Sequence, residues 1–211
     1  MTVLAVSLVA SAGGCKKKKK EEGLTPEEAT KVAQMKPVVE QRLAQIASLA
    51  PKAKARLTVS TDQPITEKLP PGSYVLVGDE YLADPNATGL ELDLSDARVW
   101  LCKRIVERAE VQRDDLAHLE GCTRIEYAAV IRKTSFTRPK VGDAVYTAGE
   151  FRGDMLVFHL ATGELRGSYH LSAKNDEQIN TKGKVEKHEV EEIAVKELVT
   201  NVKEAAVEKL K

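Results

Sequence analysis

Cysteine and histidine are the residue types in this 211-residue chain best suited to chemistry, and both are few. The cysteines are Cys15, Cys102 and Cys122. Structural zinc sites use closely spaced cysteines and histidines. This sequence has no CxxC pair, and His118 is the lone histidine near the last two cysteines. We therefore predict no metal ligand and no cofactor.

Two of the four histidines, His159 and His170, lie on the two arms of a predicted hairpin, eleven residues apart. Antiparallel pairing could place them on one face of a sheet, where they could bind a metal or act as a general base. In the alternative, His170 shares the polar face with Arg166 and Ser168, and His159 is an ordinary strand residue. We favour this second interpretation.

Acidic side chains gather between residues 79 and 96, around two predicted turns. Calcium takes six to eight oxygen ligands, and the loop at residues 84–88 could supply some of them. The loop lacks the regular alternation of an EF-hand, so a solvated acidic rim is the favoured interpretation.

The sequence contains no short catalytic motif: GxSxG, HExxH, the P-loop and GxGxxG are all missing. We assign no catalytic residue, and a non-enzymatic protein is favoured while an enzyme stays open. The 32 basic and 32 acidic residues give zero formal charge, which argues against a broad nucleic-acid surface. Three Phe, one Trp and five Tyr are too few for a base-stacking platform, so no nucleic-acid partner is predicted.

The first fifteen residues read MTVLAVSLVASAGGC and join an apolar stretch to small residues and a cysteine. Residues 3–12 have the length of the hydrophobic region of a signal peptide. The segment that follows, Ala12-Gly13-Gly14-Cys15, resembles the lipobox of bacterial lipoproteins. In that family the cysteine thiol carries a diacylglyceryl group, the preceding peptide is removed, and the new amino terminus is acylated. The resemblance implies a signal peptide at residues 1–14 and lipidation, including palmitate-type acyl chains, at Cys15.

Two features depart from the family pattern. Ala12 stands where leucine is usual, and no Lys or Arg precedes Cys15. The alternative is that residues 3–9 form a buried strand and Cys15 is a plain thiol. The run Lys16–Lys20 favours the lipoprotein, because a block of like charges stays solvated. Residues 15–25 are accordingly interpreted as a lipidated cysteine with a lysine-rich tether.

The resemblance implies a place in the bacterial cell envelope, because two or more acyl chains attach a protein stably to a membrane. Lys16, rather than aspartate, follows the cysteine, and by the sorting rule known for Gram-negative lipoproteins this favours the outer membrane, facing the periplasm. The periplasm is oxidising, so the two remaining cysteines, Cys102 and Cys122, are expected to form a disulfide. Two buried free thiols are the alternative.

Residues 26–211 are predicted to form a single α+β domain with a long helix at each end. Thr25-Pro26-Glu27-Glu28 reads as a helix start with a capping box. The apolar stripe that follows is interrupted by Pro37, which is expected to kink or split the helix, and Pro51 ends it. A second long helix is expected from about residue 185 to 211.

The region between these helices changes to the period of strands. Strands are expected at residues 56–60, 73–78, 90–94, 124–133, 155–160 and 165–173. Residues 114–120 are expected to be helical. Residues 97–109 fit both periods and are interpreted as a strand, in which Trp100 would share a face with Cys102 and cover the disulfide. Short turns between strands favour a single antiparallel sheet of about five to seven strands, with both long helices packed on one face.

These patterns predict a membrane-anchored lipoprotein that binds a protein or an envelope polymer without catalysing a reaction. Its partners would be the membrane, through the N-terminal lipid, and one envelope component. One alternative is an accessory subunit of an envelope assembly or transport machine. A cell-envelope hydrolase is the third hypothesis, which a deep pocket with a histidine and an acidic residue at its floor would favour.

Overall fold

A computed structural model describes residues 23–56, 59, 61–66, 68–86, 92–142, 145–176 and 186–211. The lipobox-like segment, Cys15 and the lysine run lie outside the described residues, as do parts of the strands expected at residues 56–60 and 90–94.

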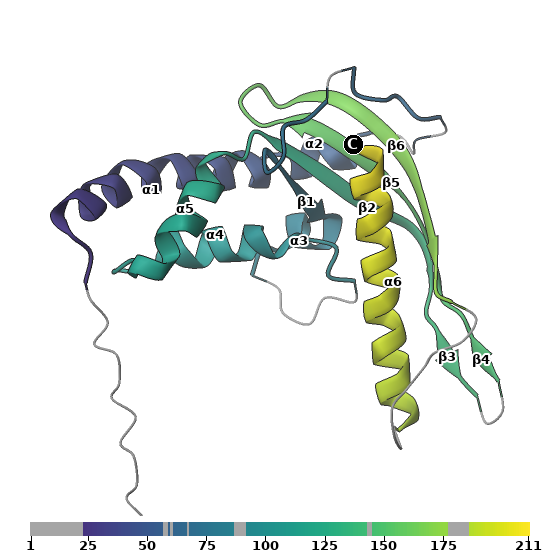
Figure 1. The fold of residues 1–211 in the computed structure, drawn as a ribbon. Helices are drawn as coiled ribbons and strands as arrows, with labels where there is room; N and C mark the ends of the chain where they lie inside the picture. The colour runs from purple at the N-terminus through teal and green to yellow at the C-terminus, as the bar shows by residue number, and fades with distance from the viewer. Residues whose placement is uncertain are drawn as a thin grey trace, which may run out of the picture.

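Helices occupy both ends of the described chain and the segment between its first two strands (Figure 1). The helices are α1 (Pro26–Ala47), α2 (Ala50–Lys54), α3 (Asp79–Ala83), α4 (Ala97–Glu107), the 3₁₀ turn η1 (Arg113–Asp115), α5 (Leu116–Thr123) and α6 (Lys187–Lys209). The strands are β1 (Tyr74–Gly78), β2 (Tyr127–Thr137), β3 (Lys140–Val141), β4 (Tyr146–Thr147), β5 (Glu150–His159) and β6 (Glu164–Lys174).

The protein is α+β, with a four-stranded mixed sheet in the order β1-β2-β5-β6 and a separate two-stranded sheet of β3 and β4. Strand β1 runs parallel to β2, and the other pairs are antiparallel. The expected single antiparallel sheet of five to seven strands is therefore wrong. The segment from β1 to β2 contains α3, α4 and α5, and such a helical crossover returns the chain parallel to the strand it left.

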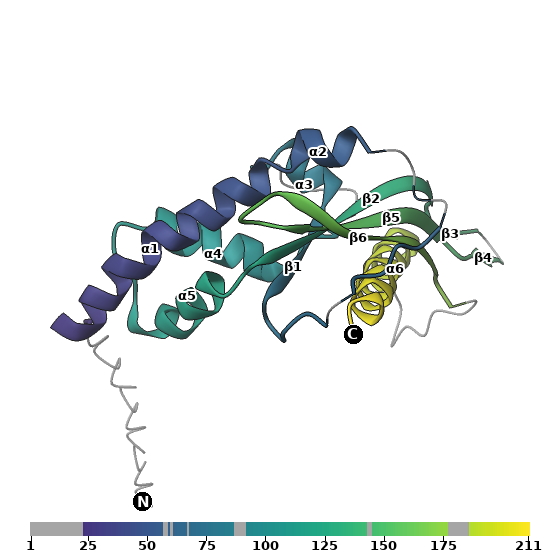
Figure 2. The same ribbon diagram turned by 90° about the horizontal axis from the view of Figure 1, so that it is seen from above.

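The two long helices cover opposite faces of the sheet, rather than one face as expected (Figures 1 and 2). Residues of α1, α4 and α5 pack with Val75 and Val77 in what we call the first core. Residues of α6 pack with Leu76 in the second core. Successive strand residues point to opposite faces, so the unbroken apolar run of β1 needs cover on both sides.

Residues 97–107 form helix α4, which corrects the strand expected there. The Asp96 side chain accepts a hydrogen bond from the Arg98 backbone N–H and caps the helix. Val99, Cys102 and Ile105, three residues apart, form its buried face. Trp100 sits elsewhere on the helix and packs edge-on against Tyr81, with ring centroids 4.9 Å apart. Residues two apart on a helix point in nearly opposite directions, so the expected stacking of this ring on the disulfide is also wrong.

Helix α1 runs unbroken through Pro37, whose ring is on the exposed side of the helix. The expected capping box is present: the Thr25 N–H donates to Glu28 Oε2 at 2.7 Å, and the Glu28 N–H donates to Thr25 Oγ1 at 3.2 Å. The helix ends at Ala47, just before the short helix that contains Pro51. Among the described residues, no helix is both long and apolar enough to cross a membrane.

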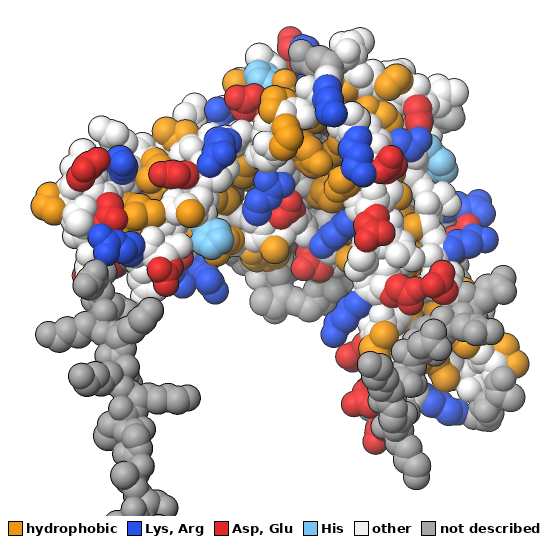
Figure 3. All heavy atoms as spheres, viewed as in Figure 1, with side chains coloured by type: hydrophobic (Ala, Val, Ile, Leu, Met, Phe, Trp, Pro, Cys, Tyr) orange, Lys and Arg blue, Asp and Glu red, His pale blue; other side chains and the backbone are white. Residues whose placement is uncertain are grey.

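Helices α1, α4 and α5 form an arm that extends to one side of the sheet (Figure 1). Between this arm and α6 the visible face is hollowed (Figure 3). Basic and acidic side chains are interspersed over that face (Figure 3).

Candidate functional site

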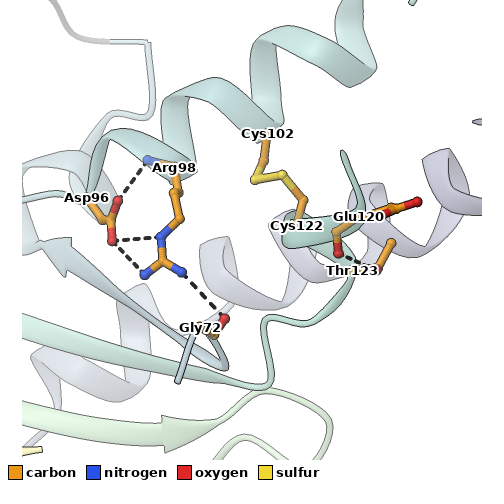
Figure 4. The surroundings of a disulfide bond; sticks show 7 residues. All are labelled: Gly72, Asp96, Arg98, Cys102, Glu120, Cys122 and Thr123. Atoms are coloured by element: carbon orange, nitrogen blue, oxygen red, sulfur yellow. Dashed lines mark hydrogen bonds and ion pairs between the residues drawn. A yellow bond between two sulfur atoms is a disulfide. The ribbon is translucent and has the colours of Figure 1, made fainter. Parts of the chain in front are cut away.

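A disulfide joins Cys102 of α4 to Cys122 of α5, the pair expected from the sequence (Figure 4). Both residues are almost fully buried and belong to the first core. The bond closes a loop of 20 residues that contains η1. The bond therefore links α4 covalently to α5, and both of these helices pack against α1.

Close to the disulfide, Arg98 fastens the start of α4 to the beginning of β1 (Figure 4). Its guanidinium donates to Asp96 Oδ2 through Nε at 3.0 Å and through Nη2 at 2.8 Å. The Arg98 Nη2 also donates to the Tyr74 carbonyl oxygen at 2.6 Å. These contacts hold α4 in place, so we assign them a structural role.

The two strand histidines lie on opposite faces of the sheet. His170 is opposite Asp154 in the β5–β6 pair, and His159 is opposite Glu164. Asp154 and His159 are five positions apart on β5, and an odd spacing places two strand residues on opposite faces. The His159 ring packs instead against Tyr127, with centroids 5.2 Å apart. The shared histidine site considered from the sequence is therefore wrong, and the described residues contain no cluster of three potential metal ligands.

The acidic residues at the end of β1 are tied to the backbone and to a lysine. Asp79 accepts hydrogen bonds from the backbone N–H groups of Lys133 at 3.1 Å and of Glu80 at 3.0 Å. Burial raises the pKa of the Asp79 carboxyl, and these two hydrogen bonds oppose the shift. Glu80 pairs with the Lys133 ammonium at 3.1 Å. These carboxylates are engaged in the fold, and residues 87 and 88 of the candidate calcium loop lie outside the described residues.

A buried ion pair between Arg132 of β2 and Asp154 of β5 is a feature that the sequence analysis missed. The Arg132 Nη2 donates to Asp154 Oδ2 at 2.8 Å, and the Asp154 side chain is 1% exposed. The Arg132 Nη1 donates to the carbonyl oxygens of Ala53 and Arg56 at 2.7 Å each. The pair therefore joins the sheet to the C-terminal end of α2. The sequence signal that could have revealed this pair is Asp154, an isolated aspartate beside the apolar residues of β5.

A hollow with a volume of about 800 Å³ lies between α2 and the β5–β6 turn. We call it the basic hollow, because Lys52, Arg56 and Arg166 line it. Lys52 Nζ donates to the Gly163 carbonyl oxygen at 3.1 Å, which joins α2 to the turn. Gly163 has a φ of +64°, and an added Cβ would lie 2.1 Å from Lys52 Nζ. Glycine at position 163 therefore permits both the positive φ of the turn and the close approach of Lys52 Nζ to the backbone.

A second hollow, of about 300 Å³, lies between α1, α3 and α4. Leu43 and Val106 contribute apolar walls, and Lys103 and Glu107 stand at its edge. Burial raises the pKa of the Tyr81 hydroxyl, which lines the same hollow, and the charge of Glu107 acts in the same direction. Lys103 donates to the Pro85 carbonyl oxygen at 3.0 Å, so its charge is engaged in the fold.

No protein-family model, curated protein or solved structure matches this chain. The site must therefore be interpreted from its own chemistry. The basic hollow presents permanent positive charge over an apolar floor, an arrangement suited to holding an anionic ligand.

Proposed function

We propose that this protein is a lipoprotein of the bacterial envelope, anchored through Cys15, whose folded domain binds a partner without chemical conversion. The observation that carries the proposal is the Cys102–Cys122 disulfide. Structural disulfides persist in oxidising compartments and are rare in the cytosol, so the bond supports export. The pairing also leaves Cys15 as the remaining cysteine, which is the residue that the lipobox-like segment assigns to the lipid.

The position of α1 agrees with an anchor at its N-terminal end. The described chain enters α1 at Pro26, at the free end of the arm, and α2 follows the other end of this helix (Figure 1). Lys52 of α2 lines the basic hollow. A helix of 22 residues is about 33 Å long. An anchor before residue 26 would therefore leave the hollow free to face away from the membrane.

The test is the intact mass of the full chain extracted from bacterial membranes, measured before and after reduction. We expect the mass of residues 15–211 plus the acyl groups, with a gain of two hydrogens on reduction. The Cys15→Ser variant is the matched control, and it should lose the acyl mass, remain uncleaved and keep the disulfide. A wild-type mass equal to the uncleaved, unlipidated chain would refute the anchor, and an unchanged mass on reduction would refute the disulfide.

A further inference from the structure

The charge around the basic hollow is unbalanced. Lys52 comes from α2, Arg56 follows two residues after the end of this helix, and Arg166 comes from β6. Among the described residues that line the hollow, Glu164 is the one carboxylate. It lies 3.9 Å from Arg166 Nη1, so it offsets part of the charge of that residue. Three positive groups against one negative group leave a net positive hollow.

The floor of the hollow is apolar. Phe158 is 1% exposed and belongs to the first core, and Leu165 packs against that core while remaining half-buried. A volume of about 800 Å³ lies within the roughly 300–1,000 Å³ of ordinary ligand pockets. A ligand that fits would carry carboxylates for the positive rim and an apolar group for the floor.

We propose that the basic hollow binds an acidic peptide segment of a partner protein, with its carboxylates on Lys52, Arg56 and Arg166 and an apolar side chain over Leu165. Placing the partner in the envelope rests on the proposed function. On that proposal the headgroups of the anchoring membrane are the less favoured anion, because α1 places its N-terminal end about 33 Å from the start of α2.

The experiment measures binding of a fluorescent 12-residue peptide of alternating glutamate and leucine to the purified full chain, by fluorescence anisotropy. The Lys52→Glu/Arg56→Glu/Arg166→Glu variant should weaken binding by at least roughly tenfold, because it reverses every positive charge of the rim. Binding should also weaken as salt rises from about 0.05 to 0.5 M, because rim charges are screened.

The matched control is Lys31→Glu/Lys140→Glu/Lys196→Glu, which reverses three exposed charges on α1, β3 and α6. It carries the same net charge as the test variant and should bind the peptide within about twofold of the wild type. Equal loss in both variants would overturn the proposal, because the attraction would then depend on overall charge. The single variant Arg56→Glu, at an exposed side chain, provides the test if the triple variant does not fold.

Two further probes distinguish the source of the anion. Inorganic phosphate at millimolar concentration should not displace the peptide. Vesicles of phosphatidylglycerol should not bind more tightly than the peptide. If the vesicles bind more tightly than the peptide, and the triple variant abolishes vesicle binding, then a lipid surface replaces the acidic peptide as the ligand. The Cys15→Ser variant should bind the peptide like the wild type, because peptide binding does not require the lipid anchor. If the wild-type protein does not bind the peptide, the anchoring proposal therefore still stands.

Discussion

Asp154 shows how one residue can bring distant segments together. It is a fully buried acid within an apolar strand, and it faces Arg132, whose guanidinium also reaches two carbonyl oxygens at the end of α2. Its Oδ1 atom has no hydrogen-bond partner among the described residues. Breaking a buried pair costs more than the pair contributes, because the remaining charge stays desolvated.

We therefore predict that Asp154→Ala lowers the free energy of unfolding by about 3–5 kcal/mol in urea denaturation. The control is Glu150→Ala, which breaks the Glu150–Arg152 pair on the same strand, where the Arg152 side chain is 59% exposed. This exposed pair should contribute far less than the buried one, because solvent screens its charges. Equal losses for the two variants would contradict the role assigned to the buried pair.

Glu28 gives a prediction about pH. Hydrogen bonds from the Arg113 side chain and from the Thr25 backbone N–H lower the pKa of Glu28 from its ordinary value of 4.5 to about 2. Because the pKa is lowered on folding, the stabilisation is complete above about pH 4.5 and is lost as the pH falls towards 2. A carbon NMR titration of the Glu28 carboxyl should show this low midpoint.

The matched variant for this titration is Arg113→Ala, which removes the guanidinium 3.0 Å from Glu28 Oε1. The Glu28 midpoint should rise in this variant, because the largest cause of the shift is gone. A wild-type midpoint near 4.5, or one that Arg113→Ala leaves in place, would show that the pairing does not persist in solution.

At the scale of elements, helix α6 contributes to stability through the face that packs against the sheet. Ala194, Leu198, Val202 and Ala206 recur every four residues and are buried against the sheet. Ile193 lies on the other side of the same helix and is 43% exposed. The apolar stripe therefore belongs to the second core, and an apolar residue beside the stripe does not.

We predict that Leu198→Ala lowers the free energy of unfolding by about 2–5 kcal/mol, because it leaves a cavity between α6 and the sheet. Ile193→Ala is the control on the same helix and should change it by less than about 0.5 kcal/mol. Urea denaturation followed by circular dichroism measures both variants. A loss at Ile193 as large as that at Leu198 would mean that another surface covers the exposed face of α6.

At the scale of the whole molecule, the sheet separates two cores, and strand residues contribute to both. The disulfide belongs to the first core, with α1, α4 and α5, while α6 belongs to the second. Closing a loop of 20 residues stabilises a fold by roughly 3 kcal/mol in the chain-entropy model. Reduction should therefore loosen one side of the sheet first.

We predict that reduction with dithiothreitol speeds amide hydrogen exchange in α4 and α5, while exchange in α6 changes much less. Hydrogen exchange with mass spectrometry resolves these segments. The Cys102→Ala/Cys122→Ala variant should show the same pattern without reductant, and reductant should then have no further effect. A uniform increase over the whole chain would show that the two cores open as one unit.

The sequence predicted the parts of the fold that depend on neighbouring residues. The capping box at Thr25 and Glu28, strand β1, the β5–β6 hairpin and the C-terminal helix all follow from local patterns. The strand predicted at residues 97–109 is wrong. Val99, Cys102 and Ile105 have the spacing of a helix, but only the structure shows that these three residues form the buried face. Short apolar segments fit both periods, and tertiary contacts select between them.

By itself, the sequence determined where the first long helix begins and how it is capped, and which cysteines could pair, because these depend on residue type and short spacing. Only the tertiary structure decided that β1 lies parallel to β2 and that α1 and α6 cover opposite faces. It also decided the basic hollow, where Lys52 meets Gly163 across a separation of 111 residues. Such long-range contacts arise from the packing of whole elements, and no local pattern encodes which distant surfaces will meet.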